Sequence, residues 1–160
     1  MVEVIPYSDS HRASVLNIIL SIQREEFEIP VSLADQPDLL DIAGFYRKGN
    51  GNFWVALVDA QVVGTISLLD IGNDQGALRK MFVAAPFRGS THGVALHLLE
   101  TLLNWCRLKD TREIYLGTTS KFLAAHRFYE KNGFTEIEQI HLPAAFPIMA
   151  VDTKFYQRRL

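Results

Sequence analysis

The segment with the clearest chemical potential is residues 81–95, MFVAAPFRGSTHGVA. Its pattern predicts an apolar strand, then a tight loop containing arginine and glycine, then the start of an amphipathic helix. This order directs a row of free backbone N–H groups and the positive end of a helix dipole at one place. Because such a place binds phosphate, we expect a diphosphate against this loop, with the attached group running along the neighbouring strand.

Two stretches of the sequence resemble one enzyme family. Residues 88–93, RGSTHG, lie between the predicted strand and helix. They resemble the acetyl-CoA loop of the GNAT (GCN5-related) N-acetyltransferase superfamily, in which Arg or Gln is followed by two residues, Gly, one residue, and Gly or Ala. Residues 125–134, AHRFYEKNGF, are similar to a later segment of that family, in which Ala, Tyr and Gly-Phe recur at this spacing.

The loop departs from the family pattern at one position. Arg88 fills the first position and Gly93 the last, whereas Thr91 stands where the family usually has its first glycine. A Cβ atom there crowds the approach of phosphates to the backbone unless Thr91 has a negative φ angle. The backbone conformation of Thr91 is therefore an early test of the resemblance.

The resemblance implies acetyl-CoA as the cosubstrate, bound mainly by backbone groups. The diphosphate would lie on the loop and the first helical residue, with the Arg88 side chain as counter-charge. The pantetheine arm is an amide chain, so it would add to the strand edge like an extra strand. The residues expected to bind acetyl-CoA are Met81, Phe82, Val83, Arg88, Gly89, Ser90, Thr91, His92, Gly93 and Val94.

The same resemblance implies transfer of the acetyl group to a primary amine, of a small molecule or a peptide, by direct attack in a ternary complex. A backbone N–H near Phe82 or Val83 would donate to the thioester carbonyl oxygen. Tyr129 falls where the family has the tyrosine that protonates the leaving thiolate.

The general base is not assigned by the sequence. The amine must be neutral to attack, and at pH 7 a lysine-like amine costs about 4.6 kcal/mol to deprotonate. Ala77 occupies the place where many relatives have a glutamate. Glu25, Glu26 and Asp70 remain as alternatives, acting directly or through water.

Four residues are expected near the acceptor amine: Glu25, Glu26, Phe27 and Tyr46. Glu25 and Glu26 either lie in solvent at the end of the first helix or form an anionic rim that attracts a cationic amine. The two aromatic residues belong either to the core or to the walls of an acceptor slot.

Two other functions stay open at this stage. A domain that binds or senses acyl-CoA without catalysis would explain Thr91 and Ala77, which both depart from the family pattern. A nucleotide-binding protein is disfavoured, because no Lys followed by Ser or Thr comes after the loop.

Composition excludes several further classes. The chain has 160 residues, 16 basic and 18 acidic side chains, and a formal net charge of −2, which gives no support for nucleic-acid binding. No apolar run reaches the roughly 18 residues of a membrane span, and the first residues lack a secretory signal pattern. The single cysteine, Cys106, favours a reducing, cytoplasmic setting, and the five histidines lack metal-ligand spacing.

Strands are predicted wherever the apolar pattern is continuous or alternates between Gly, Asn and Asp clusters. The expected strands are residues 2–5, 53–58, 62–71, 77–84, 113–117, 134–140 and 149–155. Those at 77–84 and 113–117 flank the helix at 93–108, so we expect them to be parallel neighbours with a right-handed crossover. The adjacent Arg79 and Lys80 are expected to point to opposite faces of the sheet.

Helices are predicted where apolar residues recur at three and four. The expected helices run from a cap at Asp9 or Ser10 to about Phe27, from Asp35 through Tyr46 to a stop at Gly49, over 93–108 and over 123–131. The sequence thus predicts a single α+β domain over residues 1–160. The resemblance implies that this domain is GNAT-like (acyl-CoA N-acyltransferase), with a mixed, mostly antiparallel central sheet flanked by helices on both faces. The resemblance also allows a homodimer through the last strands.

Overall fold

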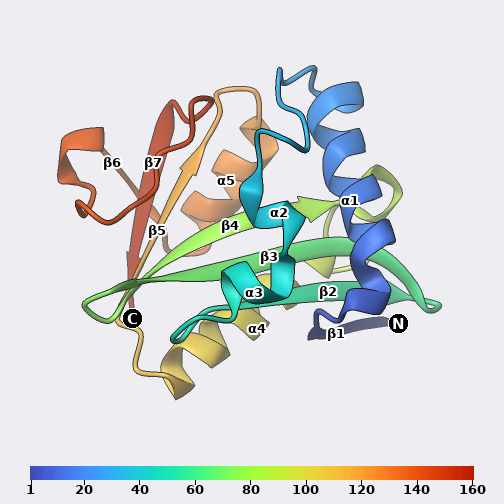
Figure 1. The fold of residues 1–160 in the computed structure, drawn as a ribbon, viewed down its shortest axis with the longest axis horizontal. Coiled ribbons are helices and arrows are strands. Elements are labelled where there is room, and N and C mark those ends of the chain that lie inside the picture. The colour runs from blue at the N-terminus through green and yellow to red at the C-terminus, as the bar shows by residue number, and fades with distance from the viewer.

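A seven-stranded sheet forms the centre of the protein (Figure 1). The computed structural model describes all residues from Met1 to Leu160, and the strand order is β1-β2-β3-β4-β5-β7-β6. Only β4 and β5 are parallel, and every other neighbouring pair is antiparallel. The strands are β1 (Val2–Pro6), β2 (Asn52–Val58), β3 (Gln61–Gly72), β4 (Gln75–Val83), β5 (Glu113–Thr118), β6 (Thr135–Ile137) and β7 (Lys154–Arg159).

Helices cover both faces of this sheet, so the predicted α+β architecture is confirmed. In Figure 1, α1, α2 and α3 lie in front of the sheet and α4 passes behind it. No helix combines the length and the apolar character needed to cross a membrane. The helices are α1 (Arg12–Leu20), α2 (Pro37–Leu40), α3 (Ile42–Tyr46), α4 (Val94–Leu108) and α5 (Leu123–Lys131).

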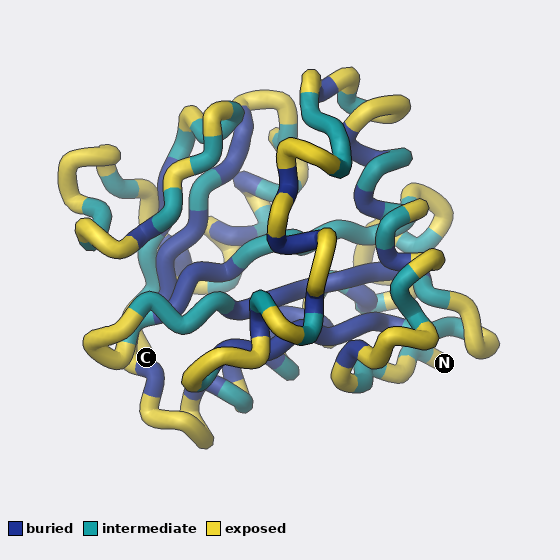
Figure 2. Tube along the Cα trace, viewed as in Figure 1, coloured by how far each residue is buried: buried dark blue, intermediate teal, exposed yellow.

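Two apolar layers hold the helices against the sheet. On one face the apolar stripe of α4, including Leu98 and Leu102, packs with strand residues and with Tyr129 of α5. On the other face Ile19 of α1 and Tyr46 of α3 pack against alternate residues of β2. The strands between these layers are the most deeply buried part of the chain (Figure 2).

The two helices before β2 differ from the prediction. The first begins after Ser8 rather than Asp9 or Ser10, with a single 3-10 turn over Asp9–His11, and it ends in a π-helical turn over Ser21–Glu26. The second is broken at Asp41, whose backbone is not helical (φ −145°, ψ 81°) and whose carboxylate accepts a hydrogen bond from the Gly44 N–H at 3.1 Å. Asp41 caps α3 instead of continuing α2, as short polar side chains favour.

The last strand begins later than predicted. The residues expected to start it form a turn, in which the Met149 N–H donates to Asp152 Oδ2 at 2.9 Å and the Asp152 N–H donates to the Met149 carbonyl at 3.0 Å. β7 starts only at Lys154, and β6 is shortened to three residues. The expected strand at 134–140 was therefore too long, since a 3-10 turn over Gln139–His141 follows β6. The expected strand at 149–155 began too early, because an Asp-closed turn occupies its first residues.

β4 and β5 separate soon after they meet. They pair only from Gln75 to Ala77 on β4 and from Glu113 to Tyr115 on β5. Beyond these residues β5 continues along β7, while β4 continues along β3. The edge of β4 that faces β5 is therefore without a partner strand from Leu78 to Val83, and a wedge-shaped gap opens between the two strands.

A β-bulge at Lys80 overturns one sequence prediction. Thr65 and Ser67 of β3 are two residues apart, but their partners on β4, Phe82 and Arg79, are three apart. Lys80 has a left-handed φ of +51°, which absorbs the extra residue. Alternation fails at this point, so the side chains of Arg79 and Lys80 reach the same carboxylate, that of Asp38, instead of opposite faces.

Candidate active site

The turn between β4 and α4 has the backbone shape that its glycines permit. We call residues 88–93 the phosphate loop. Gly89 and Gly93 have left-handed φ angles of +92° and +64°, and an added Cβ atom would meet open space at both. Glycine is thus needed for conformation and not for room. Thr91 is not among the residues with positive φ, so the crowding considered above does not arise.

The N–H groups of this turn are left free by the chain. None from Gly89 to Leu96 donates to a backbone carbonyl, whereas the next, that of His97, donates to the Gly93 carbonyl at 3.0 Å. Four of these groups belong to the first turn of α4, where the helix dipole places about half a positive charge. The row is therefore prepared to accept an anion.

The Arg88 side chain is held by Glu26 of the π-helical turn. Its guanidinium makes a bidentate ion pair with that carboxylate, one bond of which measures 2.7 Å, and Nε donates to the Val83 carbonyl at 2.8 Å. The hydrogen bonds from Arg88 lower the pKa of Glu26. Both side chains are about one-third exposed, so this pair contributes at most about 1 kcal/mol. Arg88, predicted to bind phosphate, and Glu26, predicted to form part of an anionic rim, thus contact each other.

The residues expected to hold the pantetheine arm lie on the open edge of β4. Met81, Phe82 and Val83 are all half-buried and belong to the part of the strand that has no partner on the β5 side. The Phe82 ring contacts Phe122 edge-on, with centroids 6.1 Å apart. An extended amide chain therefore has a free strand edge to pair with.

Tyr129 lies on α5 and its ring belongs to the apolar core. The ring packs tilted against Phe134 and Tyr156. Burial raises the pKa of Tyr129, so its hydroxyl stays protonated at neutral pH. The only fully buried side-chain nitrogen or oxygen without a partner is Asp38 Oδ1. The Tyr129 hydroxyl also makes no hydrogen bond within the chain but is not completely buried, so it is free to donate to a ligand.

The carboxylates considered as general bases differ in their environment. Both oxygens of Asp70 accept backbone hydrogen bonds, from Asn50 at 2.8 Å and from Gly72 at 2.9 Å. The Asp70 carboxylate therefore stabilises two turns near the C-terminal end of β3. Glu26 is bound to Arg88, so Glu25 is the one carboxylate of the three that has no partner in the chain.

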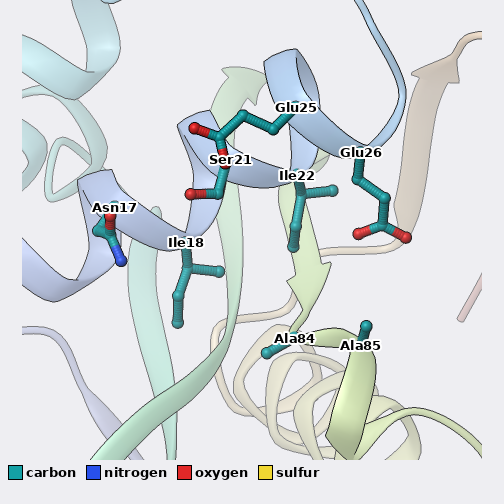
Figure 3. Close-up of a pocket in the computed structure, with 8 residues that line it drawn as sticks. All are labelled: Asn17, Ile18, Ser21, Ile22, Glu25, Glu26, Ala84 and Ala85. Atoms are coloured by element: carbon teal, nitrogen blue, oxygen red, sulfur yellow. The ribbon is translucent and has the colours of Figure 1, made fainter.

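Glu25 and Glu26 line a cavity of about 440 Å³ between the first helix and the segment that follows β4. Ile18 and Ile22 lie on the helical side and Ala84 and Ala85 on the other (Figure 3). The other two residues expected near the acceptor do not line this cavity. Phe27 packs edge-on against Phe122 at 4.8 Å, and Tyr46 is fully buried. The four are therefore not gathered in one slot.

Tyr46 leads to a group that the sequence analysis missed. Its hydroxyl donates to Asp38, and Asp38 lies near both Arg79 and Lys80. We call Asp38, Tyr46, Arg79 and Lys80 the buried polar cluster. Two adjacent cations inside an otherwise apolar strand were the available signal, and strand alternation wrongly separated them.

Other chemically capable side chains have structural partners. His126 is buried with Nε2 at 2.9 Å from the Thr119 carbonyl, and Cys106 is buried in the core under α4. No group of three or more His, Cys, Asp or Glu side chains is arranged to hold a metal ion.

A sheet whose two parallel strands separate, with a strand–turn–helix anion site beside the gap, defines an acyltransferase of the GNAT type. Residues 16–134 match the Acetyltransferase (GNAT) family, and the chain belongs to that family. The structure is similar to an acetyltransferase of the GNAT family from Staphylococcus aureus, with a TM-score of 0.96 and 39% identity over 99% of both chains.

Two further proteins extend this comparison. N-acetylaspartate synthetase from Danio rerio is 36% identical over 102 residues, which are 62% of this chain and 36% of that protein. The chain spans about a third to a half of the curated relatives it matches. The fold also matches PaiA N-acetyltransferase from Thermoplasma acidophilum in complex with coenzyme A, with a TM-score of 0.74, 13% identity and coverage of 100% and 99%.

Proposed function

We propose that this protein transfers the acetyl group of acetyl-CoA to a primary amine by direct attack within a ternary complex. The observation that carries the proposal is the row of free N–H groups at the phosphate loop, next to an unpaired strand edge. Membership of the acetyltransferase family supports the same reaction, and relatives named N-acetyltransferase or N-acetylaspartate synthetase support an amine acceptor.

Binding of acetyl-CoA uses three features of this chain. The diphosphate accepts hydrogen bonds from the N–H groups between Gly89 and Leu96. The pantetheine amides pair with the open edge of β4 at Met81 and Val83. Arg88 contributes its charge once phosphate competes with Glu26, and the weak, exposed pair between these side chains makes that exchange inexpensive.

The chemical step needs an electrophile that is polarised and a leaving group that is protonated. An N–H of β4 near Phe82 or Val83 donates to the thioester carbonyl oxygen and stabilises the negative charge that develops on it. The neutral amine attacks the carbonyl carbon, the C–S bond breaks, and the proton that the nitrogen loses passes to the thiolate sulfur by way of the Tyr129 hydroxyl, which ends the step protonated again. The raised pKa of Tyr129 suits hydrogen-bond donation, because the group stays protonated in the free enzyme.

Two measurements test this function. Calorimetric titration with CoA should show binding, and a thiol-release assay over a panel of amines should show turnover that depends on both substrates. Initial rates with both substrates varied should give intersecting double-reciprocal lines. Parallel lines would indicate a covalent acetyl-enzyme and contradict direct attack. CoA binding without turnover on any amine would favour an acyl-CoA sensor.

A further inference from the structure

The buried polar cluster contains more charge than packing requires. Asp38 is 1% exposed, and its Oδ2 lies 3.5 Å from Lys80 Nζ and 3.7 Å from Arg79 Nη2. Lys80 also donates to Gln36 Oε1 at 2.7 Å. Desolvating such ions costs several kcal/mol each unless they are well compensated, and neither ion-pair distance is that of a hydrogen bond. The cluster is therefore poorly explained as a stabilising element alone.

The buried polar cluster lies beside the gap between β4 and β5. The strands stay paired only as far as Ala77 and Tyr115. Arg79 and Lys80 are thus the first charged side chains of β4 beyond the point of separation. Their carboxylate partner is on α2, so they lie on the face of the sheet opposite to α4. A thioester held along the open edge of β4 has these cations beside it.

Asp152, in the turn before β7, approaches the same place from the side of β5. Its carboxylate lies on Gly117, where an added Cβ atom would be only 2.5 Å from Oδ2, so glycine makes room for the carboxylate. Its partner in the chain is the Met149 N–H. Arg79 Nη2 contacts Met149 Sδ at 3.6 Å, so this turn brings Asp152 to the side of the cations.

The hydrogen-bonding capacity at this place is largely unused. A guanidinium has five N–H donors, and the acceptor that the chain supplies to Arg79 is a thioether sulfur. Its ring neighbour Phe45 lies 5.6 Å from the guanidinium carbon. The Arg79 side chain is 12% exposed, and its Nε and Nη1 make no hydrogen bond within the chain. A ligand is thus able to reach them.

We propose that the acceptor is an amino acid, whose carboxylate is bound by Arg79 with Lys80 behind it and whose amino group is bound by Asp152. This proposal rests on the proposed function and names its substrate class. A planar guanidinium matches a carboxylate with two parallel hydrogen bonds. The two cations balance the two carboxylates, so a zwitterion adds no net charge to the site, whereas a polyamine or a phosphorylated amine would.

Pairs of acceptors that differ only in the carboxylate test the proposal on the unaltered enzyme. Glycine and L-alanine are compared with their α-amides in a thiol-release assay, and each kcat/KM is expressed per neutral amine, because amidation lowers the pKa of the neighbouring amino group. Loss of a charged hydrogen-bond partner is expected to lower kcat/KM about 10- to 100-fold for the amides. Equal kcat/KM within each pair would overturn the proposal.

Variants at Arg79 identify the group that carries the preference. Arg79→Gln should lower kcat/KM for the amino acids about 10- to 100-fold and leave the amides nearly unaffected. Arg79→Lys should lower kcat/KM for the amino acids by an intermediate factor, since lysine keeps the positive charge but lacks the two parallel N–H donors of the guanidinium. Arg107→Gln, at the exposed C-terminal end of α4, is the matched control and should change neither. An equal loss on acids and amides would contradict a role in carboxylate binding.

Failure of this proposal and failure of the proposed function are distinguishable. If amides and simple amines are acetylated as fast as amino acids, the proposed acetyltransferase function is retained and the proposal of an amino-acid acceptor is rejected. If CoA binds but no amine of the panel is acetylated, amino acids and amides included, both fall. Calorimetric titration of each variant with CoA shows that it is folded, because the CoA contacts lie on the phosphate loop and not on Arg79.

Discussion

The phosphate loop and the buried polar cluster are built in opposite ways. The loop presents backbone N–H groups on an exposed turn and needs particular residues only where φ is positive, at Gly89 and Gly93. The cluster uses side chains from separate parts of the chain, brought together by packing and mostly buried. Backbone-built sites tolerate many side chains, whereas a side-chain-built site loses its function with one substitution. We therefore expect cofactor binding to tolerate most substitutions in the phosphate loop, and acceptor choice to be sensitive to single substitutions in the buried polar cluster.

The largest effect is expected at the cluster. Asp38→Asn removes the carboxylate shared by two cations that are nearly buried, and we expect a loss of about 3–5 kcal/mol in the free energy of unfolding, measured with urea. Asp41→Asn is the control, since Asp41 is exposed and Asn also caps helices. Equal losses for the two variants would mean that the cluster is not electrostatically coupled.

Tyr129→Phe comes next and acts on catalysis rather than on stability. Removal of the proton donor should lower kcat about 100-fold, with CoA affinity and the unfolding midpoint nearly unchanged. Tyr7→Phe is the control, because Tyr7 is equally buried but packs in the layer under α1. A kcat for Tyr129→Phe within twofold of the unaltered enzyme would remove Tyr129 from the mechanism.

A smaller effect is expected at the loop. Gly93→Val places a branched side chain at a φ of +64°, which costs about 1–2 kcal/mol and should weaken CoA binding about 5- to 30-fold, measured by calorimetry. Gly72→Val carries the same kind of penalty, at a φ of +83° and also in open space, in the β3–β4 turn. That control should lose stability but keep its CoA affinity. Equal losses of CoA affinity in the two variants would show that a general loss of stability, and not the shape of the phosphate loop, weakens binding.

The smallest effect is expected at Glu26. Its pKa is lowered by Arg88, so the pair stabilises the fold above the ordinary glutamate pKa and loses that contribution as pH falls through the lowered value. Glu26→Gln should therefore differ from the unaltered protein by at most about 1 kcal/mol at pH 7, and the difference should vanish in acid. It should also tighten CoA binding slightly, because Arg88 is freed. Weaker CoA binding by this variant would contradict competition between Glu26 and phosphate.

The contrast between the two regions also explains what the sequence could predict. The helix over 93–108 and the loop before it follow from local pattern, and the structure has α4 at Val94–Leu108 after a left-handed Gly93. The break at Asp41 and the bulge at Lys80 do not follow, because tertiary contacts decide between a cap and a helix or between alternation and a bulge. The cluster depends on both features, so no local pattern could reveal it.

A crystal structure of the complex with acetyl-CoA tests the central claim most directly. We expect both phosphates of the diphosphate to lie within about 3.2 Å of N–H groups between Gly89 and Leu96, with the pantetheine arm along the open edge of β4. The thioester should then lie between the Tyr129 hydroxyl and the side of the sheet that carries Arg79. A diphosphate bound away from this turn, or a Tyr129 hydroxyl directed away from the sulfur, would contradict the proposed site.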